Sequence, residues 1–273
     1  MKKHFVLSIF AALSLCAALQ ARTVYVTRHG QVEPKNKSLR ISSPSGAIDI
    51  KLTDLGKEQA KLLGEYLVKE KKFNGTVYVS PFNRTTETGL IVAEMIGKKV
   101  LLEPGIQEVA RGKKHKVMTG AEISAIFAGK AIPGSGFTDD WRLGGESNDA
   151  RHVRVAKAID RILKETKGDI LLVSHGGTCG SIIRAFNKKL NKGVKPAKGI
   201  TWNCSLFIYE MDDNDRVTSA SYTTEYMPDE KVTSNFRAPK VPKPEDPRYE
   251  VPKGAARGKA PNMDDPLKEV LKK

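Results

Sequence analysis

Apolar residues recur along this chain at two spacings, one typical of β-strands and the other of α-helices. Short runs rich in β-branched residues predict strands, and apolar residues three or four positions apart predict helices. The predicted strands cover residues 23–27, 76–79, 100–102, 169–173, 201–210 and 217–225, the last as an edge strand. The predicted helices cover residues 54–70, 81–96, 121–127, 149–166 and 178–190. Because strands and helices alternate, we expect an α/β fold, a three-layer sandwich whose largely parallel central sheet is flanked by helices.

Two of the predicted helices have a recognisable beginning. Thr53 stands before residues 54–70, and its hydroxyl suits an N-cap position. Ser80 is followed by Pro81, which suits an N-cap residue followed by proline at the first helical position. We therefore expect the second helix to begin at Pro81.

The two ends of the chain differ in composition from its middle. Lys2 and Lys3 precede an apolar run at 5–19, which is shorter than a usual membrane span and typical of an export signal. A buried N-terminal helix is the alternative. Residues 237–273 are rich in proline and lysine, so we expect extended or disordered chain there.

The predicted organisation is thus a signal peptide at 1–21, one domain at 22–236 and an extension at 237–273. We expect export to a periplasm or to the outside of the cell. No stable membrane span is expected after the signal is cleaved.

The composition is that of a soluble globular protein with a strong positive charge. Of the 273 residues, 40% are apolar and 28% are charged, which is ordinary for such a protein. The formal net charge of +15 favours anionic partners such as phosphate esters, nucleic acid or a membrane surface. The basic residues are not interleaved with aromatic residues, which argues against nucleic acid.

Cysteine and metal-binding patterns are sparse. Cys16 lies in the predicted signal, which leaves Cys179 and Cys204. These two form either one disulfide or two buried free thiols, and we favour thiols because both lie in apolar segments. The chain has no CxxC or HExxH spacing, so we expect neither a metal nor a cofactor.

Two predicted strands end in a histidine followed by glycine. One continues into Arg28-His29-Gly30 and the other into Ser174-His175-Gly176-Gly177. Ligands bind beyond the carboxyl ends of strands in open α/β sheets, so both imidazoles reach one crevice if these strands are neighbours. Gly176 and Gly177 lead into a helix whose N-terminal amides favour an anion.

A third strand end adds Arg84, in the first turn of the following helix. Together with Arg28 it supplies two planar guanidinium groups around one point, which suits a tetrahedral phosphate. Taken singly, a strand-ending histidine is usually structural and a helix arginine is usually solvated. Three strand ends that each supply a basic group predict a phosphate site.

Five segments stand out in a fixed order along the chain. They are Thr27-Arg-His-Gly30, Leu52-Thr-Asp-Leu-Gly-Lys-Glu-Gln-Ala60, Ser80-Pro-Phe-Asn-Arg-Thr-Thr-Glu-Thr88, Gly145-Glu-Ser147 with Arg154, and Ser174-His-Gly-Gly177. Together they resemble the signature of the histidine phosphatase superfamily, in its phosphoglycerate-mutase-like branch. The second histidine stands in Ser-His-Gly rather than His-Asp, which separates the chain from the acid phosphatase and phytase branch.

The resemblance implies a phosphoglycerate-mutase-like fold and a metal-independent phosphatase that hydrolyses phosphate monoesters through a phosphohistidine intermediate. The implied nucleophile is His29. The implied ligands of the phosphoryl oxygens are Arg28, Arg84 and His175, with Gly176 beside them at a helix N-terminus. A carboxylic acid is also implied, which protonates the leaving oxygen and then activates water.

We assign that acid to Glu108, which precedes Gly112 in a stretch similar to the family's, with Glu146 as the alternative. Gln31 and Asn36 are weaker candidates for phosphate contact. Gln31 follows the His-Gly pair as in the family, and Asn36 lies one residue beyond the family's asparagine position.

Two other functions remain open at this point: a phosphoglycerate-mutase-like phosphotransferase and a non-catalytic phosphate-binding module. Export argues against the first, because glycolytic intermediates are cytoplasmic. The joint presence of the four basic residues argues against the second. The expected partner is a phosphorylated small molecule or a phosphoprotein, and the cluster Lys113-Lys-His-Lys116 either holds a second anionic group or is solvated.

Overall fold

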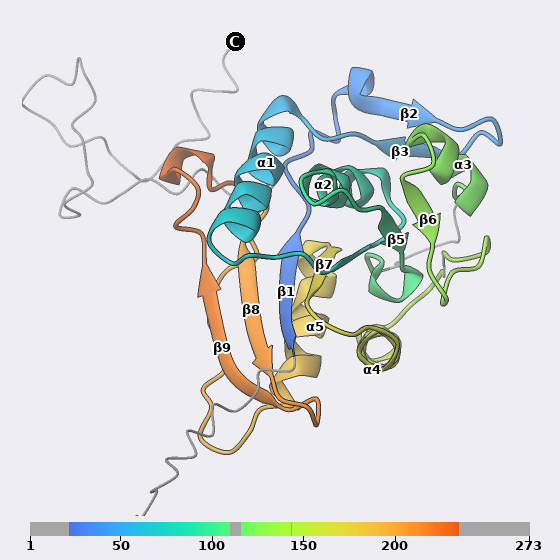
Figure 1. Ribbon diagram of the computed structural model, residues 1–273. Helices are drawn as coiled ribbons and strands as arrows, with labels where there is room; N and C mark the ends of the chain where they lie inside the picture. The colour runs from blue at the N-terminus through green and yellow to red at the C-terminus, as the bar shows by residue number, and fades with distance from the viewer. Residues whose placement is uncertain (1–21, 110–115, 143, 235–273) are drawn as a thin grey trace, which may run out of the picture. The chain divides into compact units, whose positions relative to one another are not determined.

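A mixed sheet of seven strands forms the centre of the molecule (Figure 1). The computed structural model describes residues 22–109, 116–142 and 144–234. The spatial order of the strands is β6 (Ala131–Pro133), β5 (Val100–Leu102), β4 (Thr76–Val79), β7 (Ile170–Ser174), β1 (Arg22–Arg28), β8 (Leu206–Met211) and β9 (Val217–Thr223). The first five are parallel, and β8 and β9 run antiparallel to their neighbours. The sheet is therefore largely parallel, as predicted, with β9 at one edge.

Helices cover both faces of this sheet. One core joins side chains such as Val77 and Leu171 to α1 (Asp54–Lys69), α2 (Asn83–Glu94) and α3 (Gly120–Ile126). The other joins the alternate strand positions, such as Leu172, to α4 (Asn148–Glu165) and α5 (Gly176–Asn187). Successive residues of a strand point to opposite faces, so each strand feeds both cores. The predicted three-layer α/β sandwich is confirmed.

Most predicted elements are found, and the differences lie in short or irregular segments. The strand predicted at 201–210 begins at Leu206, and the helix predicted at 178–190 begins at Gly176. Thr53 is the N-cap of α1, where its hydroxyl accepts a hydrogen bond from the Gly56 amide at 3.0 Å. The strand β6 was not predicted, because three residues are too few to show a period.

The prediction for the start of α2 was wrong. This helix begins at Asn83, its N-cap residue is Phe82, and no side chain of the N-cap hydrogen-bonds to the helix. Ser80 therefore does not cap α2, and its hydroxyl is available to a neighbouring strand end.

A small second sheet lies within the polar stretch at 31–51, which showed no strand pattern. It is a hairpin of β2 (Arg40–Ser42) and β3 (Ile48–Ile50). The hairpin lies at the same end of the molecule as the first turn of α2, which brings Asp49 of β3 to the Asn83 amide (Figure 1). The polar stretch is thus an ordered wall beside the carboxyl ends of the parallel strands.

Candidate active site

The carboxyl ends of three adjacent strands bring the predicted histidines together. The strand β7 lies between β1 and β4, so the His29 amide donates to the Ser174 carbonyl at 3.0 Å, and the Ser80 amide to the Val173 carbonyl at 3.1 Å. The ring centroids of His29 and His175 are 5.3 Å apart. The two imidazoles therefore lie side by side where β1 and β7 end.

The His29 ring is buried and its tautomer is fixed by a backbone contact. Its Nδ1 atom lies 2.7 Å from the Gly30 carbonyl oxygen, which can only accept a hydrogen bond. The proton therefore sits on Nδ1, and Nε2 carries the lone pair. Burial, followed by the charges of Arg84 and Arg28, lowers the pKa of His29 well below its ordinary value. A neutral imidazole whose Nε2 atom carries the lone pair is the form that a nucleophile requires.

The backbone around His29 is fixed by close packing against α1 and α2. A Cβ atom on Gly30 would lie 2.3 Å from the Gly56 carbonyl oxygen, so only glycine fits this position. The Gly30 amide donates to Thr88 Oγ1 at 3.0 Å, and Asn203 Nδ2 donates to the His29 carbonyl at 2.8 Å. These contacts hold the His29 ring in one place without using its Nε2 atom.

His175 is fully buried, and both of its ring nitrogens have partners. Arg84 Nη2 lies 3.1 Å from Nδ1, and since a guanidinium only donates, Nδ1 is the acceptor. The proton is then on Nε2, which donates to Ser80 Oγ at 2.8 Å. Burial, followed by the charges of Arg84 and neighbouring groups, lowers the pKa of His175 well below its ordinary value. Ser80 thus orients a site histidine, a role that its place in the sequence did not indicate.

Two arginines supply positive charge next to the histidines. Arg28 Nη1 donates to the Thr201 carbonyl at 3.3 Å, and the Arg84 guanidinium lies 4.5 Å from the centroid of the Phe82 ring. Burial lowers the pKa of both arginines, which means that water solvates their charges poorly. An anion placed between them would gain more than it would from exposed arginines.

Asp49 is a site residue that the sequence analysis missed. Its Oδ2 atom accepts from the Asn83 amide at 2.6 Å, and its Oδ1 atom lies 3.4 Å from Arg84 Nη1. The carboxylate therefore caps α2 from another element and orients Arg84 at the same time. Nothing in the local sequence around Asp49 signals this, because the contact depends on the hairpin lying against α2.

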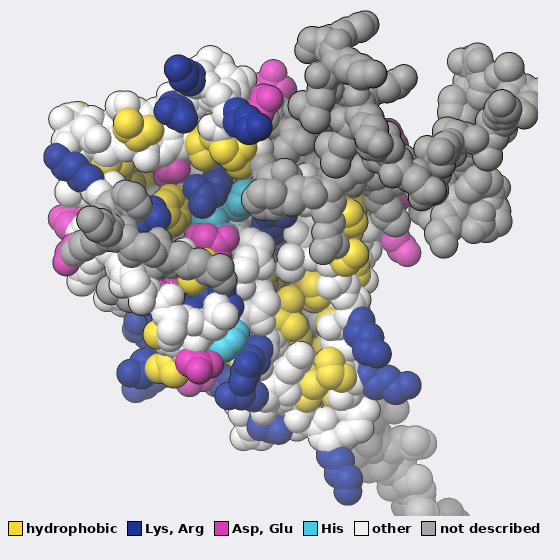
Figure 2. Space-filling view, turned by 180° about the vertical axis from the view of Figure 1, so that it is seen from behind, with side chains coloured by type: hydrophobic (Ala, Val, Ile, Leu, Met, Phe, Trp, Pro, Cys, Tyr) yellow, Lys and Arg dark blue, Asp and Glu magenta, His cyan; other side chains and the backbone are white. Residues whose placement is uncertain are grey.

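Glu108 faces the same crevice from the segment after β5. Its carboxylate accepts from Thr178 Oγ1 at 3.2 Å and from the Val109 amide at 2.9 Å. It lines a cavity of about 410 Å³ together with Arg84, and another of about 310 Å³ together with Arg28 and Gly176. On the face shown in Figure 2, histidine, basic and acidic side chains lie close together and next to hydrophobic ones. The placement suits the predicted acid.

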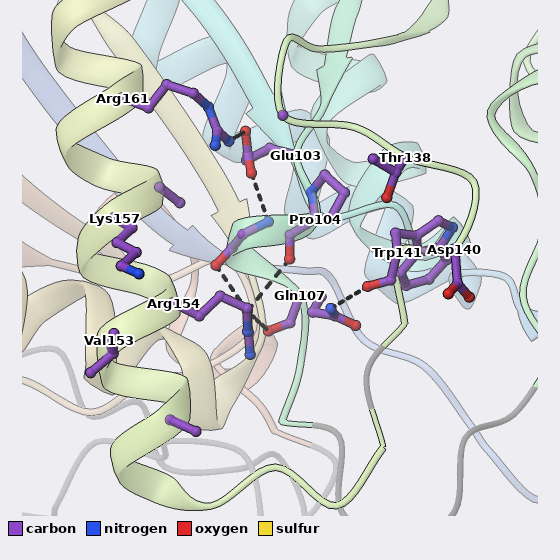
Figure 3. A pocket seen from close by; sticks show the side chains of 14 residues that line it. Glu103, Pro104, Gln107, Thr138, Asp140, Trp141, Val153, Arg154, Lys157 and Arg161 are labelled. Carbon is purple, nitrogen blue, oxygen red and sulfur yellow. Dashed lines mark hydrogen bonds and ion pairs between the residues drawn. The ribbon is translucent and has the colours of Figure 1, made fainter.

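The alternative acid, Glu146, has a different environment. Its two carboxylate oxygens each bind Arg154, at 2.7 Å from Nε and from Nη2. Arg154 also donates to the Gly105 carbonyl at 2.9 Å and approaches the Gln107 carbonyl at 3.4 Å (Figure 3). The Glu146–Arg154 pair therefore fixes the segment that carries Glu108.

The same segment is held at its other end. Glu103 forms an ion pair with Arg161 of α4, and Gln107 Nε2 donates to the Trp141 carbonyl at 2.7 Å (Figure 3). The 3-10 helix η2 (Pro104–Ile106) lies between these anchors. The residues that lead up to Glu108 are thus tied to α4 and to Trp141.

The two weaker candidates lie differently from each other. Gln31 Oε1 accepts from Thr53 Oγ1 at 2.9 Å, so Gln31 ties the loop after His29 to the first turn of α1. Asn36 bonds within its own loop, where Oδ1 accepts from Ser38 Oγ at 2.7 Å. The structure brings neither side chain into contact with the two histidines.

Cys179 and Cys204 are buried free thiols, and burial raises the pKa of Cys179 to about 12. Among the residues that the structure describes, no group of histidine, cysteine and acidic side chains could hold a metal ion. In the same part of the chain, no helix is long and apolar enough to cross a membrane. The predicted signal at 1–21, the extension at 237–273 and residues 113–115 of the basic cluster lie outside the described residues.

Known proteins match this chain over most of its described length. The model of the histidine phosphatase superfamily (branch 1) matches residues 24–223. Phosphoglycerate mutase-like protein 4 of Arabidopsis thaliana is 32% identical over 199 residues, which are 71% of this chain and 82% of the relative. The metal-independent phosphoserine phosphatase of the same plant is 28% identical over 202 residues, 70% of this chain and 76% of the relative.

A solved structure agrees with the fold. The ecdysone phosphate phosphatase from Bombix mori superposes with a TM-score of 0.54 at 21% identity, covering 72% of this chain and 92% of its own. The order of motifs, the strand topology and the family match agree with one another. The chain belongs to the histidine phosphatase superfamily, branch 1.

Proposed function

We propose that this protein is a metal-independent phosphatase that hydrolyses phosphate monoesters through a phosphohistidine at His29. The observation that carries the proposal is the state of the His29 ring. It is neutral, its Nδ1 proton is engaged by the Gly30 carbonyl, and its Nε2 lone pair is free to attack. Relatives named as phosphatases, including a metal-independent phosphoserine phosphatase, support this choice of reaction.

In the first step, the Nε2–phosphorus bond forms while the bond from phosphorus to the ester oxygen breaks. Arg28 and Arg84 bind the equatorial oxygens and stabilise the charge that develops on them. His175 accepts from Arg84 at its Nδ1 atom, so its part in this step is to hold the guanidinium that binds the phosphoryl group. The leaving oxygen takes its proton from the carboxylic acid of Glu108.

In the second step, the Glu108 carboxylate takes a proton from water, whose oxygen attacks phosphorus. The Nε2–phosphorus bond breaks, inorganic phosphate leaves, and His29 and Glu108 return to their starting forms. Glu108 lines both the cavity beside Arg84 and the cavity beside Arg28, so one carboxylate serves the leaving oxygen and the incoming water.

The test is hydrolysis of an aryl phosphate by the chain in the presence of a chelator, with His29→Ala alongside. His152→Ala serves as the matched control, because His152 lies on α4 and takes no part in the site. We expect activity in chelator that falls about a thousandfold or more in His29→Ala and is unchanged in His152→Ala.

The intermediate gives a second readout. Quenching in base and mass spectrometry should find one added phosphoryl group on the peptide that contains His29. Turnover without any phosphorylated His29, or turnover that requires an added metal, would contradict the proposal.

A mutase is the second candidate, favoured by the 32% identity to a phosphoglycerate mutase-like protein. It would use the same phosphohistidine and return the phosphoryl group to the substrate rather than to water. Isomerisation of a phosphorylated hydroxy acid is therefore measured with and without a bisphosphate primer. Primer-dependent isomerisation that outpaces phosphate release would replace the phosphatase proposal.

Export belongs to the same proposal and rests on the sequence of residues 1–21 alone. We expect the cell to export the protein from its cytoplasm in a form that lacks this segment. Cell fractionation followed by determination of the N-terminal residue tests it, and a cytoplasmic full-length protein would contradict it.

A further inference from the structure

A basic stretch lies in the last turn of α5 and in the segment that follows this helix. Between Asp169 and Glu210 the sequence has no acidic residue, and it has six lysine and arginine residues. They are Arg184, Lys188, Lys189, Lys192, Lys195 and Lys198. The stretch leads to Ile200, which lines the cavity beside Arg28. The proposed reaction uses none of these six side chains.

The segment after α5 is anchored on its inner side. Ala197 is buried in the core that α5 shares with the sheet. The Tyr222 hydroxyl of β9 donates to the Ile200 carbonyl at 2.7 Å, and a Cβ atom on Gly199 would lie 2.3 Å from the Tyr222 ring. The lysines between these anchors are exposed: Lys192, Lys195 and Lys198. An ordered backbone therefore presents these lysines to solvent.

Most of the cations in this stretch have no carboxylate partner. Lys189 pairs with Asp160 of α4 at 2.8 Å. Within the described part of the chain, five of the six form no ion pair: Arg184, Lys188, Lys192, Lys195 and Lys198. Asp212, which contacts Asn191 of this segment, is engaged by the Arg216 amide at 2.9 Å. Unpaired charges of one sign attract an anionic partner.

The positive charge continues from α5 onto α4. Desolvation, followed by the charges of Arg184 and Arg151, lowers the pKa of His152, and Lys188 acts in the same direction against Asp149. Arg151 and His152 lie on α4, whereas Arg184 lies on α5. Cations from both helices therefore meet around His152, and the basic stretch is part of a wider positive surface.

Aliphatic side chains accompany the lysines, and aromatic ones do not. Ile200 is 45% exposed, and Leu190 and Val194 are half-buried. No aromatic residue stands between Phe186, which is buried, and Trp202, so the stretch offers no platform on which bases could stack. Five of the six cations are lysines, whose compact charges suit a diffuse anionic surface. Lysines interspersed with aliphatic residues are typical of surfaces that bind anionic lipid headgroups.

We propose that this surface docks the protein on an anionic phospholipid membrane. The lysine surface consists of Arg184, Lys188, Lys192, Lys195, Lys198 and Ile200. The cations bind the headgroups, and Ile200 reaches the boundary of the acyl chains. Because Ile200 also lines the cavity with Arg28 and Glu108, docking brings the mouth of the crevice close to the membrane. This binding does not depend on the proposed reaction.

The test is sedimentation of the full chain with two kinds of vesicle. One kind contains phosphatidylcholine alone, and the other contains equal amounts of phosphatidylcholine and phosphatidylglycerol. The ratio of the two affinities measures the preference for anionic lipid, and it cancels binding by the apolar run at 5–19, which is indifferent to lipid charge. Residues 237–273 are the same in every variant.

Two triple variants that lose the same charge are compared. The first combines Lys192→Gln, Lys195→Gln and Lys198→Gln in the lysine surface. The matched control combines Lys57→Gln, Lys61→Gln and Lys69→Gln in α1, which packs on the other face of the sheet. All six side chains are exposed or lie at the surface, so both variants should keep the wild-type Tm.

We expect the wild-type chain to prefer the anionic vesicles by about 100- to 1,000-fold, because each lysine near an anionic surface contributes about fivefold. The variant of the lysine surface should lose about 100-fold of this preference, and the control should keep most of it. The preference should fall at high salt, because the Debye length shrinks from about 10 Å at 0.1 M to about 3 Å at 1 M.

Equal affinity of the wild-type chain for both kinds of vesicle would overturn the proposal. A preference that survives in the variant of the lysine surface would overturn it too, because other cations would then bind the lipid. An equal loss in both triple variants would reduce the effect to net charge and would also overturn it. Competition with polyphosphate and with single-stranded RNA completes the test, and tighter binding to either than to anionic vesicles would replace the membrane with a soluble polyanion.

Discussion

Removal of the Asp49 carboxylate should damage stability and catalysis together, because this one group serves both. It accepts from the Asn83 amide at the start of α2 and pairs with Arg84 in the site. Asp49→Ala loses both contacts, and Asp49→Asn keeps an acceptor for the helix while removing the charge that faces Arg84. Comparison of the two variants separates the helix cap from the ion pair.

The magnitude follows from the two contacts. Loss of a capping contact costs about 1–2 kcal/mol, and removal of one partner of a largely buried ion pair costs about 3–5 kcal/mol. Together they lower the free energy of unfolding by about 4–7 kcal/mol, which lowers the Tm by about 10–25 °C in a domain of this size. Displacement of Arg84 by about 1 Å lowers kcat/KM by about 100-fold.

Calorimetric melting and steady-state hydrolysis well below the Tm measure the two effects independently. Asp139→Ala is the matched control, because the Asp139 carboxylate accepts from the Gly120 amide of α3 at 2.7 Å and faces none of the site histidines or Arg84. We expect Asp139→Ala to lower stability alone. Wild-type kcat/KM in Asp49→Ala would refute the assignment of Asp49 to the orientation of Arg84.

The remaining predictions concern the acid and the pH dependence of stability. Glu108→Gln should lower kcat by about 10²–10⁴-fold, with a larger loss for esters with poor leaving groups, whereas Glu146→Gln should mainly lower the Tm. Steady-state kinetics over a series of aryl phosphates checks this prediction. The reverse pattern would assign the acid to Glu146. Because burial lowers the pKa of His29 and His175 in the folded chain, the unfolded chain binds more protons below about pH 6.5, and stability is lost as the pH falls below that value. Measured by urea unfolding, the free energy of unfolding should fall by about 1.4 kcal/mol per pH unit for each buried neutral histidine. This slope should be smaller in His29→Asn. A wild-type chain without the slope would show that both rings are protonated in the folded state.

Local patterns predicted the main elements of the fold because each depends on neighbours in sequence. The apolar run that ends at Arg28 and the run that ends at Ser174 are strands, and the periodic segment at 149–166 is a helix. The strand β6 and the two strands of the small hairpin have three residues each and showed no period, whereas β5, of the same length, was predicted from its apolar run. The start of α2 was mispredicted because Ser80 and Pro81 satisfy a local rule that a tertiary contact overrides.

Some residues of the candidate site were likewise predicted correctly, and others were not. His29, His175, Arg28 and Arg84 were predicted because each lies at a strand end or one turn beyond it, and the strand order then placed them together. Gln31 and Asn36 were predicted as weaker contacts from the family resemblance, and the structure engages them elsewhere.

By itself, the sequence determined which residue types stand at the carboxyl ends of the strands, and so the kind of ligand the crevice suits. Tertiary structure alone decided the protonation and partners of those residues. Ser80 reaches His175 and Asp49 reaches Arg84 through contacts that join distant parts of the chain. The physical reason is that hydrogen-bond direction, burial and charge balance depend on distance in space, which a local pattern in the sequence does not encode.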